Sequence, residues 1–199
     1  MSELFFERID KAFEFNHLYQ GFDWQLSTGK HCLVGQNGCG KTTLLMMAAG
    51  VEPIDGGSIR FDGTDVFAVE SKPFIGLSSD KVQLPSFLTA KQLIEFQCKT
   101  FNCQWPESLI ERLEFKDHIH TLVPKLSLGN QKKLSLILAF CHHPQCLLLD
   151  EPTTGLDVNA RKVILELMLE FEGVLLVTSH DKQLKQHPQF SVYELDELR

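Results

Sequence analysis

The chain has 199 residues, 43% of them hydrophobic, and its 19 basic and 26 acidic residues give a formal net charge of −7. This apolar content is enough for a buried core and argues against a disordered chain. The acidic balance argues against nucleic acid as a partner, because phosphate binding needs a basic face. No uncharged apolar run reaches the roughly 18 residues of a membrane span, and the acidic N-terminus does not look like a signal peptide. We therefore expect a soluble, cytoplasmic protein.

Short apolar runs alternate along the chain with segments of helical spacing. In chain order, the expected strands are Leu4–Ile9, His31–Val34, Cys146–Leu149, Val174–Thr178 and Phe190–Leu195. The expected helices are Thr42–Ala49, Ala90–Cys98, Glu107–Phe115, Leu128–Phe140 and Val158–Phe171. Buried strands that alternate with amphipathic helices favour an α/β fold with a mainly parallel central sheet.

Two stretches depart from this alternation. The turn-rich segment Glu52–Gly57 precedes a short apolar run at Ser58–Phe61, which predicts a small antiparallel β region near the N-terminal strands. Residues 85–125 are mostly helical in pattern and are interrupted by prolines. We expect them to form a helical insert within a single domain that spans residues 1–199.

The clearest motif is the sequence GQNGCGKT, which matches the phosphate-binding pattern G-x4-G-K-[ST] between an expected strand and an expected helix. Its glycines allow a tight turn whose N–H groups face one anion, and the helix N-terminus adds partial positive charge. Lys41 is expected to reach the β- and γ-phosphates, and the Thr42 hydroxyl to ligate Mg²⁺. The expected ATP-binding residues of this loop are Gly35, Gln36, Asn37, Gly38, Cys39, Gly40, Lys41, Thr42 and Thr43.

A pair of carboxylates ends the apolar strand Cys146–Leu149. The tip of a buried parallel strand opens at the sheet edge where α/β proteins bind ligands, beside the phosphate loop. Asp150 is therefore a candidate Mg²⁺ ligand, usually through water. Glu151 is a candidate general base that polarises an attacking water molecule.

Three further motifs give the chain a family resemblance. The sequence LSLGNQKK at residues 126–133 resembles the signature L-S-G-G-Q of ATP-binding cassette (ABC) ATPases. The sequence TTGLD at residues 153–157 resembles their D-loop, and TSHD at residues 178–181 resembles their switch-histidine segment. The chain is thus similar to the nucleotide-binding subunits of ABC transporters, which have a P-loop NTPase fold.

The resemblance implies a head-to-tail dimer, in which each ATP lies between the P-loop of one protomer and the signature of the other. The second subunit is then a copy of this chain or a different cassette. In this arrangement Ser127, Gly129 and Asn130 contact ATP, and His180 acts with Glu151 in catalysis. The resemblance also implies ATP hydrolysis with Mg²⁺ that powers a separate integral membrane permease, with the chain at the inner face of the membrane. We expect Lys132 and Lys133 to lie on a solvated face.

Two family positions are less well matched. Asp80 aligns with the usual Q-loop glutamine and is expected to ligate Mg²⁺, with Gln83 as the competing assignment. Phe13 is the preferred adenine-stacking aromatic, and Phe15 is the alternative. The signature itself has Leu128 in place of a glycine and Asn130 in place of glutamine.

Other functional classes explain fewer of these features. A non-transport ABC ATPase that acts on the ribosome or DNA is the main alternative, but the chain has one cassette and neither heptads nor a basic patch. A small-molecule kinase usually needs an arginine cluster, and the arginines here do not cluster. The cysteine pairs Cys98/Cys103 and Cys141/Cys146 lack the usual zinc-site spacing, so we expect reduced, mostly buried thiols.

Overall fold

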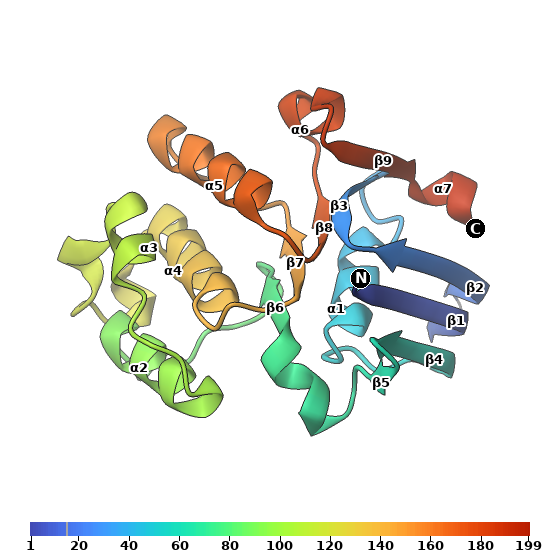
Figure 1. The fold of residues 1–199 in the computed structure, drawn as a ribbon, viewed down its shortest axis with the longest axis horizontal. Coiled ribbons are helices and arrows are strands. Elements are labelled where there is room, and N and C mark those ends of the chain that lie inside the picture. Colours follow the sequence, from blue (N-terminus) through green and yellow to red (C-terminus); the bar gives the residue numbers. More distant parts are fainter. Residues whose placement is uncertain (15) are drawn as a thin grey trace.

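The computed structural model describes residues 1–14 and 16–199, which form two β-sheets with helices between and beside them (Figure 1). The larger sheet has five strands in the order β6-β7-β8-β3-β9, and each neighbouring pair is parallel. Its strands are β3 (Gly29–Val34), β6 (Ile75–Ser78), β7 (Cys146–Asp150), β8 (Val174–Thr178) and β9 (Phe190–Glu194). Strands β7 and β8 are buried throughout, which explains their unbroken apolar sequences.

The second sheet is antiparallel, in the order β2-β1-β4-β5. Its strands are β1 (Glu3–Phe13), β2 (Asn16–Ser27), β4 (Gly56–Phe61) and β5 (Thr64–Asp65). Phe6 lies opposite Trp24 in the register, and their rings stack with centroids 5.9 Å apart. Strand β2 and the C-terminal part of β1 were not expected from the sequence, because their buried side chains alternate with exposed polar ones and form no apolar run.

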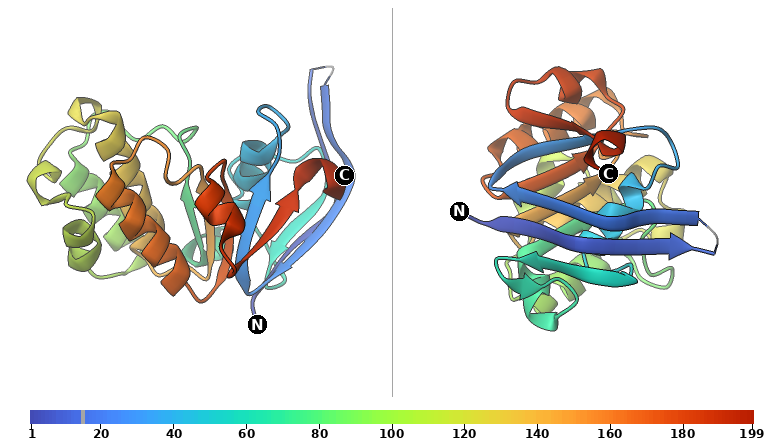
Figure 2. Two further views of the ribbon diagram at one scale, coloured as in Figure 1. Left: turned by 90° about the horizontal axis from the view of Figure 1, so that it is seen from above. Right: turned by 90° about the vertical axis from the view of Figure 1, so that its right-hand side faces the viewer.

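The helices divide between the two faces of the parallel sheet (Figure 2). Helix α1 (Lys41–Ala48) lies between the two sheets, whereas four helices cover the opposite face. These are α2 (Ala90–Phe101), α3 (Glu107–Arg112), α4 (Leu128–Phe140) and α5 (Val158–Glu170). Short helices α6 (Lys182–Gln186) and α7 (Leu195–Leu198) flank β9, so the expected strand there ends one residue early. Within the described residues, every helix is too short or too polar to cross a bilayer.

Strand β7 is held from both faces by two separate apolar cores. Leu147 and Leu149 pack into the core formed with α2, α4 and α5, while Cys146 and Leu148 pack into the core shared with α1 and the antiparallel sheet. This period of two follows from the alternation of side chains along a strand. The expected α/β fold is confirmed, and this fully buried strand ends at Asp150.

Residues 85–125 contain α2, α3 and short 3-10 turns. Helix α2 begins with a capping box, in which the Thr89 hydroxyl accepts a hydrogen bond from the Gln92 N–H and the Gln92 side chain accepts one from the Thr89 N–H. An isolated bridge between Thr89 and Leu122 joins the two ends of this segment. The segment therefore leaves and rejoins the rest of the fold at one place.

Candidate active site

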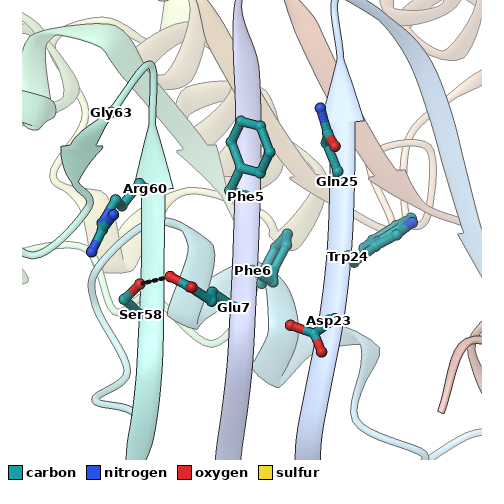
Figure 3. Close-up of a pocket in the computed structure, with 9 residues that line it drawn as sticks. All are labelled: Phe5, Phe6, Glu7, Asp23, Trp24, Gln25, Ser58, Arg60 and Gly63. Atoms are coloured by element: carbon teal, nitrogen blue, oxygen red, sulfur yellow. Dashed lines mark hydrogen bonds between the residues drawn. The ribbon is translucent and has the colours of Figure 1, made fainter.

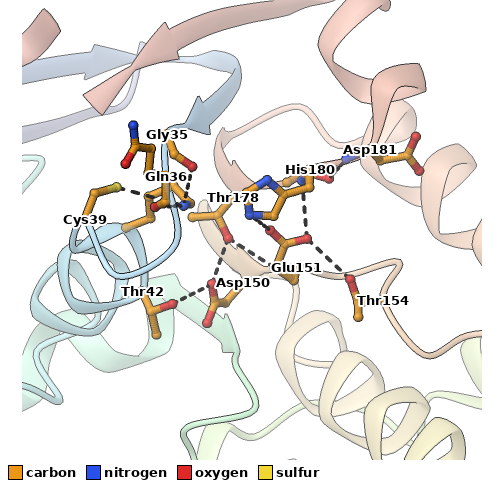
Figure 4. A network of polar contacts seen from close by, with 12 residues as sticks. Gly35, Gln36, Cys39, Thr42, Asp150, Glu151, Thr154, Thr178, His180 and Asp181 are labelled. Atoms are coloured by element: carbon orange, nitrogen blue, oxygen red, sulfur yellow. Dashed lines mark hydrogen bonds and ion pairs between the residues drawn. The ribbon is translucent and has the colours of Figure 1, made fainter. Parts of the chain in front are cut away.

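The ends of four neighbouring strands meet at one edge of the parallel sheet (Figure 4). Strands β6, β7, β8 and β3 run in the same direction, so the residues that follow them share this edge. Ser79 follows β6, Asp150 ends β7, Thr178 ends β8, and the loop from Gly35 follows β3. The polar network described below is built on this edge.

The phosphate loop connects β3 to α1, and its glycines adopt left-handed backbone angles. Gly38 has φ 82° and Gly40 has φ 110°, and a Cβ atom on Gly40 would lie 3.0 Å from the Leu18 side chain. The Lys41 ammonium donates hydrogen bonds to the carbonyl oxygens of Gly35 at 2.8 Å and Gln36 at 2.9 Å. The loop therefore holds a nearly buried cation next to the N-terminus of a helix, as phosphate binding requires.

Asp150 is the centre of a cluster of oxygen atoms. Its Oδ1 accepts hydrogen bonds from the hydroxyls of Thr42 at 3.1 Å and Thr178 at 2.7 Å, and its Oδ2 accepts one from Ser79 at 2.8 Å. Mg²⁺ prefers such hard oxygen ligands, so Thr42 and Asp150 fit the metal roles expected for them. The hydroxyls of Ser79 and Thr178 were not anticipated as site residues.

Glu151 is fixed by its backbone and by one of its carboxylate oxygens. Its φ of 45° is in the left-handed region, which is rare for a residue with a Cβ, and its N–H lies 3.1 Å from both oxygens of Thr178. Oε2 accepts hydrogen bonds from the Thr154 hydroxyl at 3.3 Å and the His180 N–H at 3.4 Å. Oε1 lies 3.5 Å from His180 Nε2 and has no hydrogen-bond donor among the described residues. This oxygen is buried and is the part of the carboxylate left without a described donor, which fits a base that takes its proton from a bound water molecule.

A cavity of about 580 Å³ lies between the phosphate loop and the carboxylates of Asp150 and Glu151. Its lining comprises Phe13, Asn16, Leu18, Asn37, Gly38, Gly40, Lys41, Thr42, Thr43, Lys81, Asp150, Glu151, Thr154 and His180. Phe13 is 46% exposed, and the Lys11 ammonium covers one face of its ring at 4.6 Å from the centroid, so an adenine base would have to stack on the other face. The alternative, Phe15, lies outside the described residues. Lys81 adds a cation that the sequence analysis did not anticipate.

A larger cavity of about 710 Å³ lies over strands β1, β2 and β4, away from the phosphate loop (Figure 3). Its polar lining includes Glu7, Asp23 and Arg60. Glu7 already accepts a hydrogen bond from the Ser58 hydroxyl at 3.2 Å. Two carboxylates beside one guanidinium do not favour a polyphosphate, so we place the nucleotide at the sheet edge instead.

The signature residues lie apart from the phosphate-loop cavity. Ser127 caps α4, and its hydroxyl accepts a hydrogen bond from the Asn130 N–H at 3.2 Å. Ser127 is exposed, whereas Gly129 and Asn130 are half-buried, and none of the three lines the cavity. A single chain therefore does not bring its own signature to its own phosphate loop.

The expectation that Lys132 and Lys133 lie on a solvated face is wrong. Lys132 is 4% exposed and donates hydrogen bonds to the Asp150 carbonyl at 2.8 Å and to Asp80 Oδ1 at 3.0 Å. Lys133 lies 3.0 Å from Asp157, whose pKa is lowered by the Ala160 N–H and by this ammonium. The lysines are buried because α4 is enclosed between the parallel sheet and residues 85–125.

The structure does not place either Q-loop candidate in the oxygen cluster. The Asp80 carboxylate, whose side chain is 71% exposed, pairs with Lys132, and Gln83 is exposed beside a neighbouring groove. The neighbouring residue Ser79 makes the contact with Asp150 instead. The roles of Asp80 as an Mg²⁺ ligand and of Gln83 as the competing residue remain predictions.

Replacing Lys132 with methionine is expected to lower the free energy of unfolding by about 1–3 kcal/mol, because the Asp150 carbonyl loses a buried donor. Asp80→Asn is expected to cost less than about 1 kcal/mol, since its side chain is mostly in water. Urea unfolding measures both. The exposed Lys99→Met variant is the matched control, and a Lys132→Met midpoint equal to that of the control would contradict the prediction.

Alkylation of Cys39 is expected to block nucleotide binding. Its thiol is half-buried within the phosphate loop, with Sγ 3.9 Å from the Lys41 ammonium. Cys39 does not itself line the nucleotide cavity, so a group added to its sulfur is expected to act by displacing the adjacent Lys41 ammonium. Labelling with a maleimide, located by mass spectrometry, should be slowed by saturating Mg-ATP at Cys39 and left unchanged at the half-buried Cys103. Equal labelling of Cys39 with and without Mg-ATP would argue against the prediction.

Comparisons with known proteins agree with this geometry. The family model for "ABC transporter" matches residues 19–154. The ABC transporter ATP-binding protein YtrB of Bacillus subtilis is 30% identical, over 96% of this chain and 72% of its own length. The cell division ATP-binding protein FtsE of Haemophilus influenzae is 31% identical, over 91% of each chain. A dimeric structure of MJ0796, a bacterial ABC transporter cassette, has a TM-score of 0.80 at 16% identity, over 96% of this chain and 94% of its own. The chain belongs to the ABC transporter family, as one of its ATP-hydrolysing nucleotide-binding subunits.

Proposed function

We propose that this chain powers transport through a separate membrane permease, as half of an ATPase dimer that is bound to the permease at the inner face of the membrane. In this proposal residues 1–199 act as one ABC ATPase domain, and residues 85–125 are a helical insert that receives the permease. The observation that carries the proposal is an apolar groove beside the active site.

The groove has a volume of about 530 Å³ and lies between the loop after β6 and the start of α4. Val82, Leu84 and Val123 contribute apolar surface to it, and Leu128 at its edge is 83% exposed. Phe87, in the same loop, is 78% exposed. A hollow with large exposed apolar side chains around it is typical of a protein-binding surface.

The groove is connected directly to the site of hydrolysis. Ser79 and Asp80 belong to the loop after β6 and also line the groove. Ser79 donates a hydrogen bond to the Asp150 carboxylate. Asp80 pairs with Lys132, which donates to the Asp150 carbonyl. A partner that moves this loop therefore shifts the contacts of the proposed metal ligand. This is a physical route by which a permease and the nucleotide can influence one another.

The exposed signature supports the dimer. The Ser127 hydroxyl and the N-terminus of the 13-residue helix α4 suit a γ-phosphate, yet they do not face the cavity of their own chain. A second cassette, either a copy or a different chain, supplies the phosphate loop in this proposal. Gly129 and Asn130 then approach the nucleotide of that partner.

Hydrolysis at this site follows from the residues around the cavity. Glu151 accepts a proton from a water molecule that attacks the γ-phosphorus, while His180 holds the carboxylate and the water in place. Lys41 neutralises charge on the β- and γ-phosphate oxygens as the bond between the γ-phosphorus and the bridging oxygen breaks, so that this oxygen leaves with ADP and the γ-phosphorus with the water oxygen becomes phosphate. When bound through Thr42 and Asp150, Mg²⁺ supplies further neutralisation of the phosphate charge.

The decisive test is to capture the tagged protein from native membranes in mild detergent and to identify the proteins that co-purify. We expect a polytopic membrane protein. The double variant Val82→Glu/Phe87→Glu is expected to lose this protein and to retain ATP binding. Val69→Glu alters a side chain that is 80% exposed in the turn before β6, and it is expected to retain both.

Recovery of ribosomal or DNA-bound proteins would overturn the permease proposal and favour the non-transport class. Recovery of only the protein itself would overturn it as well. Neither result would affect the proposed nucleotide chemistry. That chemistry rests on the phosphate loop and on the residues at the end of β7, and it does not depend on the partner that is captured. One observation favours the non-transport alternative, since the similar FtsE of Haemophilus influenzae is by name a cell division ATP-binding protein.

A further inference from the structure

Three of the six cysteines converge at a place away from the nucleotide cavity. Cys98 lies in α2, Cys103 in the turn after it, and Cys141 caps the C-terminal end of α4. Their Sγ atoms all lie within 4.8 Å of one another. The sequence spacing had paired Cys141 with Cys146, but Cys146 belongs to the core on the other face of the parallel sheet.

Local structure holds the three thiols together. Helix α2 ends at Asn102 with φ 50°, so the chain turns back and the Cys103 N–H donates to the Cys98 carbonyl at 3.0 Å. Two contacts then fix α2 against the end of α4. The Gln97 amide donates to the Leu138 carbonyl at 3.3 Å, and the rings of Phe101 and His142 stack with centroids 4.5 Å apart.

We propose that Cys98, Cys103 and Cys141 form a binding site for one soft d10 cation of the Cu⁺ or Zn²⁺ class. Thiolate sulfur is the preferred ligand of these ions. With metal–sulfur bonds of about 2.3 Å, a trigonal site needs sulfurs about 4.0 Å apart and a tetrahedral site about 3.8 Å. The observed spacing of up to 4.8 Å requires the sulfurs to move together by at most about 1 Å. Cys103 is only half-buried, so a solvent molecule has access to complete a tetrahedral set.

Binding is an exchange of protons for the cation. Without the ion, Cys98 Sγ donates to the Gln104 carbonyl at 3.5 Å and Cys141 Sγ to the Leu138 carbonyl at 3.4 Å. Burial raises the pKa of Cys98 to about 11 and also raises that of Cys141, so both thiols hold their protons at neutral pH. Each S–H bond that breaks releases a proton to solvent and forms one metal–sulfur bond, with no change of oxidation state.

The bound ion links two parts of the chain that otherwise meet through side-chain packing. Cys98 and Cys103 belong to residues 85–125, whereas Cys141 ends the helix that begins at the signature. Occupancy is therefore expected to stabilise the packing of α2 on α4. This inference does not depend on the identity of any transport partner.

The test is an anaerobic titration of the reduced full chain with Cu⁺ and, separately, Zn²⁺, each in competition with a chromogenic chelator. We expect one equivalent of at least one ion, with three sulfur neighbours in its X-ray absorption spectrum. At a hundredfold excess over Kd, the melting temperature is expected to rise by roughly 5–10 °C. Cys103→Ser removes the half-buried ligand and is expected to weaken binding by about 100-fold, the upper end of the loss seen even when a supporting residue is removed.

Two control variants separate this site from the other thiols. Cys32→Ala/Cys146→Ala removes two buried cysteines outside the cluster, and Cys39→Ser removes the thiol of the phosphate loop. Both variants are expected to bind one equivalent of the cation with the same Kd as the original protein. Failure of both ions to bind would overturn the proposal, as would binding that survives in Cys103→Ser and is lost in Cys39→Ser. Cys98→Ala gives a second check, because its binding loss must match that of Cys103→Ser.

Discussion

Replacing Lys41 with alanine is expected to abolish measurable ATP binding. The ammonium is held inside the phosphate loop by the carbonyls of Gly35 and Gln36, where it is placed to meet the β- and γ-phosphates. Charge-assisted hydrogen bonds contribute about 1.5–3 kcal/mol each. Loss of two of them raises Kd by roughly 100- to 10⁴-fold. Calorimetric titration with Mg-ATP should give a Kd for the original protein and no resolvable heat of binding for the variant.

The matched control for Lys41→Ala is Lys99→Ala, which removes the same charge from an exposed position on α2. Its Kd for Mg-ATP should stay within about twofold of the original value, since Lys99 does not line the nucleotide cavity and salt screens the charge of an exposed lysine. Circular dichroism verifies that both variants are folded. A Lys41→Ala variant that binds ATP as well as the control does would show that the nucleotide lies elsewhere.

The sequence predicted best those features that depend on neighbouring residues. The phosphate loop is continuous from Gly35 to Thr42, and its glycines do adopt left-handed angles. Strand β7 was predicted because both of its faces are buried, which leaves an uninterrupted apolar run. Strand β2 was not predicted, since only one of its faces is buried and its apolar residues alternate with polar ones.

The parts of the site that the sequence did not predict depend on contacts between distant segments. Ser79 and Thr178 meet at Asp150 only because β6 and β8 flank β7. The order of strands in a sheet cannot be predicted from the sequence of any one strand. One local sign was present: Thr178 is a polar residue at the end of an apolar strand. Lys132 was misplaced because its burial is determined by the ends of β6 and β7, where it contacts Asp80 and Asp150.

Replacing Glu151 with glutamine is expected to retain ATP binding and to reduce the rate of hydrolysis by about 10²- to 10⁴-fold. The contacts of the carboxylate explain why the change is specific. Oε2 accepts both hydrogen bonds, and the glutamine oxygen can occupy that position. The new NH₂ group then takes the place of Oε1, which has no donor among the described residues. The fold is preserved, but the atom that accepts the water proton is lost.

The same variant tests the proposed dimer, because a nucleotide that is bound but not hydrolysed keeps the two protomers together. Size-exclusion chromatography with light scattering should show twice the monomer mass with Mg-ATP and the monomer mass with Mg-ADP. Glu172→Gln changes an exposed carboxylate before β8 and should hydrolyse ATP at the unmodified rate without a trapped dimer. Slow hydrolysis without a dimer would retain Glu151 as the base and reject the contribution of the partner's signature. Hydrolysis at the unmodified rate would place the general base on another residue.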